Sequence, residues 1–415
     1  MNTYDVLIVG AGPVGLLAGL LLAQQGIRIL IVEQENEIID SPRAVVYLPQ
    51  VLGTLDQAGI LDQVKDAGLV SEMGPAWRRT SDHALLAELD PRNLEQADEP
   101  TRPAILLGQP QFARIILSNL QQTSAEIHFN HSFHSLQQRN DHIISTLLDQ
   151  TTKSTFTVKS TFVLGCDGGR SSVRKALSIP FEGFTHPLVF MAVNFRYQHM
   201  QATGFGDAQF MVDPSETLRE AGFAVILRTG RDDVWRCAYG DDASFSDTEL
   251  RARLPGRFQK ILPLHPSEGE YEILQAQPYR IHQRCASTFT KGRALLAGDA
   301  AHLNNPTGGM GLNTGPLDAH AASVAISSAL GAAEAGSAKD ILAAYDENRR
   351  RAFTEFVNPV SIDNLRRLWE KSDEADQKLR AGFFERLNHS REFQRMVQLS
   401  LNKMGLGVPG FEGIS

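Results

Sequence analysis

Short apolar runs alternate with glycine-rich turns in the first part of the chain. Residues 6–9 form a β-branched apolar run, as expected of a strand that is buried on both faces. Residues 16–25 are rich in leucine and alanine and predict a helix, with Gly26 as its C-cap. Residues 27–32 predict a second strand. A strand, a helix and a further strand in this order indicate an α/β fold with a parallel sheet.

The same alternation returns twice further along the chain. An apolar strand at 162–165 leads into a glycine cluster around Asp167, and Ser171 or Ser172 can cap the helix that follows. A strand at 294–297 leads to Asp299, and a glycine-rich loop then precedes a helix of small residues. Each cluster alone fits an ordinary turn between a strand and a helix, but three clusters in one chain favour a shared ligand.

The pattern changes between these two clusters and again near the C-terminus. Residues 181–285 predict a series of strands with many phenylalanines, most of them in the core of a sheet and one or two in a pocket. From residue 340 onward the chain is charged and predicts helices, with Arg349, Arg350 and Arg351 on a solvated helix face.

Composition excludes several classes of protein. The 415 residues suggest two or three domains, and the formal net charge of −8 gives no indication of nucleic-acid binding. The three cysteines, Cys166, Cys237 and Cys285, lack any zinc-binding spacing, so we expect no metal and a cytoplasmic location. The apolar stretch at 14–23 is too short to span a bilayer and follows no basic segment, so we expect neither membrane insertion nor a signal peptide.

The first turn carries the glycine pattern of a dinucleotide-binding loop. Gly10 permits the tight turn, Gly12 lets the backbone approach a pyrophosphate, and Gly15 lets the helix and strand pack closely. The N-terminus of the helix offers N–H groups and a partial positive charge to a diphosphate. Glu33 ends the second strand, where a carboxylate accepts hydrogen bonds from both ribose hydroxyls and repels a 2′-phosphate.

Three fingerprints together resemble one family: GAGPVG at 10–15, GCDGGRSSVR at 165–174 and GDAAH at 298–302. The sequence resembles the single-component FAD-dependent aromatic hydroxylases typified by p-hydroxybenzoate hydroxylase. Cys166 stands where this family more often has alanine, which is a change between small residues. The resemblance implies a Rossmann-type FAD-binding domain at 1–72, 100–180 and 286–345. It also implies a β-rich substrate-binding domain at 73–99 and 181–285, and a helical C-terminal region at 346–415.

The same resemblance implies which residues bind non-covalent FAD. Glu33 would bind the ribose of the AMP half, Gln109 the ribityl–phosphate side, and Asp299 a ribityl hydroxyl. Asp167 would serve both FAD and NAD(P)H, and Arg43 would reach toward the cofactor. The complete expected set is Gly10, Gly12, Pro13, Val14, Gly15, Glu33, Gln34, Arg43, Gln109, Asp167, Asp299, Pro306, Gly309, Gly311, Leu312 and Asn313.

The resemblance also implies that the loop at 306–313, which begins at Pro306, wraps the isoalloxazine ring. Gly308, Gly309 and Gly311 would let backbone N–H groups approach the ring edge. A helix that starts near Leu312 would point its positive end at N1 and O2 of the flavin. No catalytic side chain is assigned beyond this loop.

The activity that the resemblance implies is a monooxygenation. NADH or NADPH reduces FAD, and a flavin C4a-hydroperoxide transfers one oxygen atom of O2 to an aromatic, phenol-like or otherwise electron-rich small molecule. His282 and His302 are weak candidates for a base or proton relay, because a packed structural histidine is the commoner role.

Several alternatives stay open or are disfavoured. An epoxidase or a saturating reductase on the same fold remains open, as does the choice between a monomer and a homodimer. Isolated tryptophans disfavour a flavin-dependent halogenase. The flavin-ring loop disfavours a non-catalytic flavoprotein, and the second and third fingerprints disfavour an NAD-dependent dehydrogenase.

Overall fold

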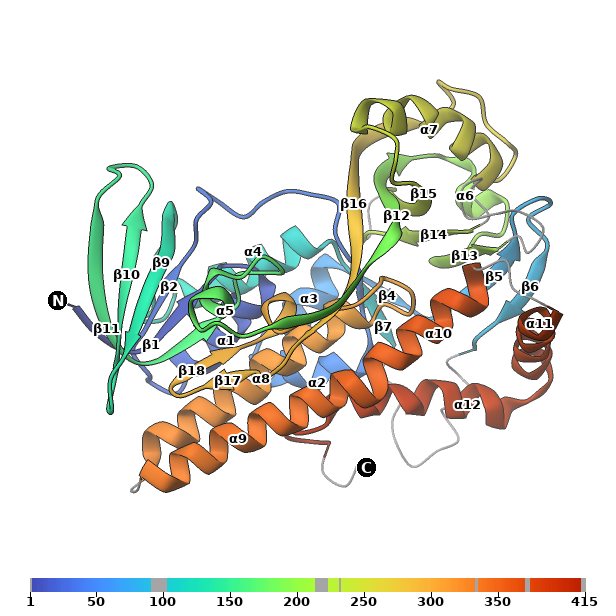
Figure 1. Ribbon diagram of the computed structural model, residues 1–415. Coiled ribbons are helices and arrows are strands. Elements are labelled where there is room, and N and C mark those ends of the chain that lie inside the picture. Colours follow the sequence, from blue (N-terminus) through green and yellow to red (C-terminus); the bar gives the residue numbers. More distant parts are fainter. Residues whose placement is uncertain are drawn as a thin grey trace.

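The computed structural model describes residues 2–90, 103–212, 223–230, 233–332, 335–369 and 374–411. Within these ranges the strands form two eight-stranded sheets and one three-stranded sheet. Figure 1 shows the two large sheets at opposite ends of the molecule. Two long strands, β12 (Phe181–Arg196) and β16 (Glu272–Ala286), run between the two ends.

The first sheet has a parallel centre. Strand β1 (Asn2–Val9) pairs in parallel with β2 (Ile29–Val32) on one side and with β11 (Thr155–Gly165) on the other. The remaining strands of this sheet are β8 (Glu126–His128), β9 (His131–Gln138), β10 (Ile143–Asp149), β17 (Thr290–Lys291) and β18 (Ala294–Leu296). The carboxyl ends of β1, β11 and β18 adjoin in register, which brings the three glycine clusters to one edge of the sheet.

Helix α1 (Pro13–Ala23) begins three residues before the expected start at residue 16. Proline is favoured in the first helical turn because its missing N–H would have no partner there, so the helix starts directly after Gly12. Gln24 is the C-cap, and Gly26, which was expected there, instead lies in the following turn with φ of 75°.

The second large sheet carries the strands that the sequence predicted between 181 and 285. Its order is β19–β16–β12–β15–β14–β13–β5–β6. The strands not yet given are β5 (Ala76–Arg79), β6 (Leu85–Glu88), β13 (Ala208–Val212), β14 (Phe223–Arg228), β15 (Trp235–Asp242) and β19 (His302–Leu303). Residues 73–90 thus contribute to the same sheet as 181–285. The domain boundaries stay a prediction, and residues 91–99 lie outside the described ranges.

The two faces of the second sheet meet different partners. Met191, Val193 and Phe195 of β12 pack beneath α7 (Asp247–Ile261), which lies on the side away from the first sheet (Figure 1). The alternate residues of the sheet point the other way, and Phe190 packs in a cluster with Leu365 of α10 (Asn358–Trp369).

The remaining elements lie around the two large sheets and extend to the C-terminus. They are β3 (Val46–Tyr47), β4 (Leu69–Ser71), β7 (Ala104–Leu106), α2 (Pro49–Gln57), α3 (Leu61–Ala67), α4 (Gln109–Leu120), α5 (Ser172–Ala176), α6 (His199–Ala202), η3 (Gly298–Ala300), α8 (Met310–Gly331), α9 (Ala335–Arg351), η4 (Ala352–Val357), α11 (Glu374–His389), α12 (Arg391–Ser400) and η5 (Leu401–Gly405). Among the helices of the described ranges, none combines the length and the apolar character of a membrane span.

Arg349 lies in the core, and the expectation that it faces solvent is wrong. Its side chain is 1% exposed, and Nε donates to Asp318 Oδ1 at 2.8 Å. The other oxygen of Asp318 lies 2.7 Å from His302 Nε2. Arg349 Nη1 also donates to the carbonyls of Met404 and Leu406. The arginine therefore joins α8, α9 and the C-terminal segment, because a buried cation needs such partners.

Candidate functional site

The glycines of the first loop are required by close approaches of the backbone. Gly10 has φ of 106°, and a Cβ there would collide with the carbonyl oxygen of Cys166. A Cβ at Gly15 would collide with the carbonyl oxygen of Gly10. Gly12, in contrast, faces open space, and no side chain caps the first turn of α1. Free N–H groups beside open space suit a diphosphate.

Glu33 lies at the end of β2 beside this loop. Its carboxylate accepts hydrogen bonds from the backbone N–H of Ala11 at 2.8 Å and of Glu35 at 3.1 Å. These bonds fix the carboxylate at the loop and leave lone pairs for further donors. Gln34 is exposed, and its side chain donates to Glu35.

Asp167 caps the helix that follows it. Its carboxylate accepts from the backbone N–H of Ser172 at 2.6 Å and of Val173 at 3.1 Å, and from the hydroxyls of Ser171 and Ser172. Ser171 is the N-cap of α5, as one of the two serines was expected to be. The expected cofactor contact of Asp167 stays a prediction, while its bonds within the protein explain an acid at this position.

Arg174 was not assigned a role from the sequence, although it belongs to the second fingerprint. It is 4% exposed and donates to the carbonyls of Ala300 at 2.7 Å and Gly169 at 2.8 Å. The guanidinium also lies 3.8 Å from the centroid of the Phe181 ring. Arg174 therefore fastens the second fingerprint to the third.

Asp299 differs from the other acids because its side chain is exposed. The surrounding protein nevertheless desolvates the carboxyl and raises its pKa, while the electrostatic effects of Arg43 and His302 oppose that shift. The structure thus brings Arg43 near Asp299, although 256 positions separate them (299 − 43). Gln109 is half-buried at the first turn of α4.

The flavin-ring loop turns sharply at two glycines. Gly308 and Gly309 have φ of 99° and 66°, and both lie in the left-handed region that favours glycine. Helix α8 begins at Met310, so the expected start near Leu312 is two residues late. Asn313 is buried, accepts from the N–H of Leu48 and donates to the carbonyls of Val46 and Gly309. Its side chain therefore holds the loop against β3.

A buried amide network that the sequence did not reveal fixes the other end of this loop. Gln283 of β16 accepts from both the backbone N–H and the side-chain amide of Asn305, at 3.0 and 3.1 Å. Its own amide donates to Asn358 Oδ1 and to Ser361 Oγ, each at 2.8 Å. Gln283 thus connects the second sheet, the flavin-ring loop and α10.

The two candidate histidines occupy different environments. His302 is 3% exposed, and its ring stacks on Phe353 with centroids 4.7 Å apart. This packing and its bond to Asp318 favour a structural role. His282 is half-buried, with Nδ1 2.9 Å from Thr185 Oγ1. Burial and the nearby Arg284, Arg280 and Arg170 lower the pKa of His282 and favour its neutral form.

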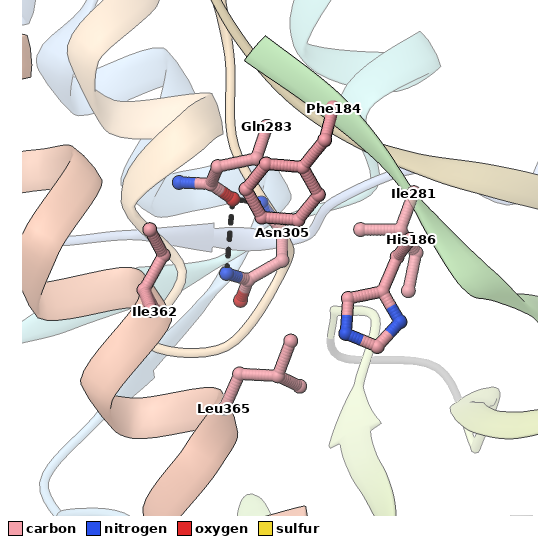
Figure 2. Close-up of a pocket in the computed structure, with 7 residues that line it drawn as sticks. All are labelled: Phe184, His186, Ile281, Gln283, Asn305, Ile362 and Leu365. Carbon is pink, nitrogen blue, oxygen red and sulfur yellow. Dashed lines mark hydrogen bonds between the residues drawn. The ribbon is translucent and has the colours of Figure 1, made fainter.

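A small cavity lies next to the amide network. Figure 2 shows Phe184 and His186 from β12, Ile281 and Gln283 from β16, Asn305 before the flavin-ring loop, and Ile362 and Leu365 from α10. Its volume is about 90 Å³. Phe184 lines this cavity, while Phe195 and Phe223 are buried in the sheet core.

Comparison with known proteins decides the family. A family model described as an FAD binding domain matches residues 3–359. The chain belongs to this family.

Two curated relatives of this FAD-binding protein align over most of both chains. Para-nitrophenol 4-monooxygenase of Pseudomonas sp. (strain WBC-3) is 34% identical over 408 residues, covering 97% of each chain. The 6-hydroxy-3-succinoylpyridine 3-monooxygenase HspB of Pseudomonas putida (strain DSM 28022 / S16) is 33% identical and covers 88% of this chain and 89% of its own.

A solved structure agrees with these relatives. The crystal structure of p-nitrophenol 4-monooxygenase PnpA from Pseudomonas putida DLL-E4 matches with a TM-score of 0.91 and 32% identity, covering 98% of this chain and 99% of that one. The protein is therefore an FAD-dependent monooxygenase that hydroxylates aromatic compounds, with NAD(P)H as the co-substrate. The open space at Gly12, the uncapped α1 and the carboxylates of Glu33 and Asp299 fit FAD.

Proposed function

We propose that the substrate is a phenol with a second substituent para to the hydroxyl group, and that oxygen enters at the carbon that carries this substituent. The cavity in Figure 2 supports this proposal most directly. It borders the flavin-ring loop through Asn305, and its volume of about 90 Å³ is small. Ligand pockets are typically roughly 300–1,000 Å³. A small cavity favours a single substituted ring over a fused ring system.

The names of the two relatives support the same position of attack. In both names the ring carries a hydroxyl group, and the oxygenated carbon is the one para to it that bears the nitro or succinoyl group. Para-nitrophenol is therefore the first substrate to test on this chain.

The proposed reaction balances with one equivalent of reductant. Para-nitrophenol, O2, NAD(P)H and one proton would give 1,4-benzoquinone, nitrous acid, water and NAD(P)+. One oxygen atom forms the new bond to the ring carbon, whose bond to nitrogen breaks, and the other oxygen atom becomes water. Bound FAD supplies the transfer of electrons from NAD(P)H to O2.

The side chains have proposed roles in binding and orientation. Glu33 would hold the ribose of FAD and Asp299 a ribityl hydroxyl, and the N–H groups of Gly309 and Gly311 would face the flavin ring. Ile281, Ile362 and Leu365 would exclude water from the ring of the substrate, because all three line the cavity with apolar atoms.

A substrate panel tests the proposal. Para-nitrophenol, meta-nitrophenol and phenol would each be incubated with the holoenzyme, NAD(P)H and labelled O2, and the products identified by mass spectrometry. We expect label in the ring and release of nitrite only from the para isomer. Labelled product from phenol or the meta isomer, with none from para-nitrophenol, would show that the proposed position of attack is wrong.

A cavity variant provides the matched control. Ile362→Trp fills the cavity and should raise KM for para-nitrophenol at least about tenfold, because overpacking a fitted site costs roughly 1–3 kcal/mol. Leu379→Trp changes an exposed residue of α11 and should leave KM unchanged. Equal KM values for both variants would show that the substrate does not bind in this cavity.

A further inference from the structure

The cavity beside the flavin-ring loop combines apolar walls with polar groups at two places. Its apolar walls are the side chains of Phe184, Ile281, Ile362 and Leu365. Figure 2 shows the bonded amides of Gln283 and Asn305 at one place and the imidazole of His186 at another. This lining suits a small apolar ring that carries polar groups at two separate positions.

An irregular stretch of β12 places His186 in the lining. Between residues 185 and 189, this strand has two more residues than the stretch of β16 that faces it, 280–282. Pro187 lies in this stretch, and proline has no N–H to donate to a neighbouring strand. His186 therefore lies outside the regular register and lines the cavity two positions after Phe184. Extra residues of this kind re-aim side chains next to active sites.

His186 is the lining residue that can exchange a proton near neutral pH. Histidine ordinarily changes its charge between about pH 5 and 8. The other lining side chains are apolar groups or amides. His282 and His302, the histidines that the sequence suggested as a base, do not line this cavity.

Other titratable groups on the same elements lie outside the lining. Four of them are exposed, namely Glu182, Arg280, Asp363 and Arg366. His282 and Arg284 both contact Thr185, on the other face of β16 from Gln283. Tyr279 packs in the core, where burial raises its pKa, so its neutral phenol does not accept a proton. Among the described residues, His186 is therefore the base that a ligand in the cavity meets.

The flavin-ring loop indicates which end of the substrate faces His186. Asn305 directly precedes this loop, so the carbon that reacts lies on the side of the two amides. In a para-substituted phenol, the hydroxyl group is on the opposite side of the ring from this carbon. Figure 2 shows His186 apart from the amides and next to Ile281. The hydroxyl group is therefore directed toward His186 when the ring lies between the apolar walls.

Resting on the proposed function, we propose that His186 is a catalytic residue that accepts the proton of the substrate's hydroxyl group and holds the resulting phenolate. The O–H bond of the phenol breaks, an N–H bond forms on the imidazole, and no electrons are gained or lost in this step. The imidazolium returns its proton to solvent when the product leaves. A phenolate is more electron-rich than a phenol, so its ring reacts faster with an electrophilic oxygen.

Proton uptake on binding tests this role. The holoenzyme without NAD(P)H would be titrated with para-nitrophenol above the pKa of the free phenol and above the ordinary pKa of histidine. The free ligand is then a phenolate and the free imidazole is neutral. Calorimetry in buffers of different ionisation enthalpy counts the protons taken up, and visible absorbance reports whether the bound ligand is a phenolate. We expect uptake of about one proton per bound phenolate, because the imidazole becomes charged.

His186→Gln keeps a polar side chain that cannot carry this proton. The variant should lose the proton uptake and bind the phenolate about tenfold more weakly, the effect of losing a hydrogen bond to a charged group. His186→Asn gives the same reading if His186→Gln does not retain FAD. His389→Gln is the matched control, since His389 is an exposed histidine at the end of α11, and it should take up the proton as the wild type does.

Three outcomes would overturn the proposal. The first is a wild-type protein that binds the phenolate without taking up a proton. The second is uptake with the absorbance of the neutral phenol, because the proton would then lie on the ligand. The third is uptake that persists in His186→Gln but is lost in His282→Gln, which would assign the proton to the other histidine.

The same experiment separates this proposal from the proposed function. A wild-type protein that takes up the proton with a bound phenolate but releases no nitrite on addition of NAD(P)H and O2 supports the role of His186 and contradicts the proposed substrate. Release of nitrite without proton uptake on binding contradicts the role of His186 and leaves the proposed function standing.

Discussion

The acids at the three glycine clusters, Glu33, Asp167 and Asp299, differ in how many hydrogen bonds they accept from the protein itself. Asp167 accepts four hydrogen bonds and Glu33 two, all from their own neighbourhood. Within the described residues no group donates to the exposed carboxylate of Asp299, and its surroundings raise its pKa. Asp299 is therefore the acid whose lone pairs are most available to a ligand.

Replacing this carboxylate should weaken FAD binding. Asp299→Ala removes an acceptor whose loss costs roughly 1.5–3 kcal/mol, and the exposure of the site favours the lower limit, so affinity should fall about tenfold. Fluorescence titration of the apoprotein with FAD measures the change. Asp62→Ala, on the exposed surface of α3, is the control and should bind FAD normally. Equal affinity in the two variants would refute the role of Asp299.

At the scale of elements, local patterns predicted the strands and the glycine turns. Residues 181–285 carry the expected strands, and the three fingerprints meet at one sheet edge, because parallel strands place their carboxyl ends together. The network of Gln283 was not predictable in this way. Its partners Asn305, Asn358 and Ser361 follow it by up to 78 positions, and a lone glutamine in a strand carries no motif.

Breaking this network should separate oxygen consumption from product formation. Gln283→Leu keeps a similar volume but leaves the backbone N–H and the side-chain amide of Asn305 without their acceptor, which costs roughly 1–3 kcal/mol for each buried group. We expect the variant to retain FAD, to show a higher KM for the substrate and to form more hydrogen peroxide per NAD(P)H consumed. The reason is that Gln283 no longer connects the flavin-ring loop to α10.

The ratio of peroxide to product measures this effect. The control is Gln150→Leu, since Gln150 bonds to Ser132 in the first sheet, far along the chain from the cavity residues. If Gln283→Leu matches the control in both KM and peroxide yield, the network does not position the loop.

At the scale of the whole molecule, one ion network joins α8, α9 and the C-terminal segment. Sequence alone placed Arg349 on a solvated face, because three consecutive arginines usually indicate an exposed surface. The tertiary contact with Asp318 overrides that pattern. Burial alone would raise the pKa of Asp318. The combined effect of His302 and Arg349 lowers the pKa by more than burial raises it, so the pKa of Asp318 lies below its usual value.

Removing the arginine should therefore destabilise the protein, most strongly above about pH 3.9, where Asp318 is ionised in both the folded and the unfolded state. Arg349→Met leaves Asp318 with one fewer partner and should lower the free energy of unfolding by about 3–5 kcal/mol. The lowered pKa of Asp318 stabilises the wild type above the unfolded value of about 3.9, and this contribution is lost as the pH falls through the folded value. The variant should thus unfold at a less acidic pH.

Thermal and acid unfolding of the FAD-saturated protein measure both effects. Arg351→Met is the control, because Arg351 is exposed on the same helix and pairs with Glu355. A surface pair is worth at most about 1 kcal/mol, so this variant should unfold nearly as the wild type does. An equal loss of unfolding free energy in both variants would mean that the buried network stabilises the protein no more than a surface ion pair does.

The second sheet also limits how specificity can be exchanged between relatives. Its strands come from residues 76–88, 181–286 and 302–303, three separate segments of one chain (Figure 1). A chimaera made with a single crossover would therefore combine strands of two parents within one hydrogen-bonded ladder. Recombination libraries that aim at new substrates should transfer all three segments together, with 358–369 of α10, as one discontinuous block.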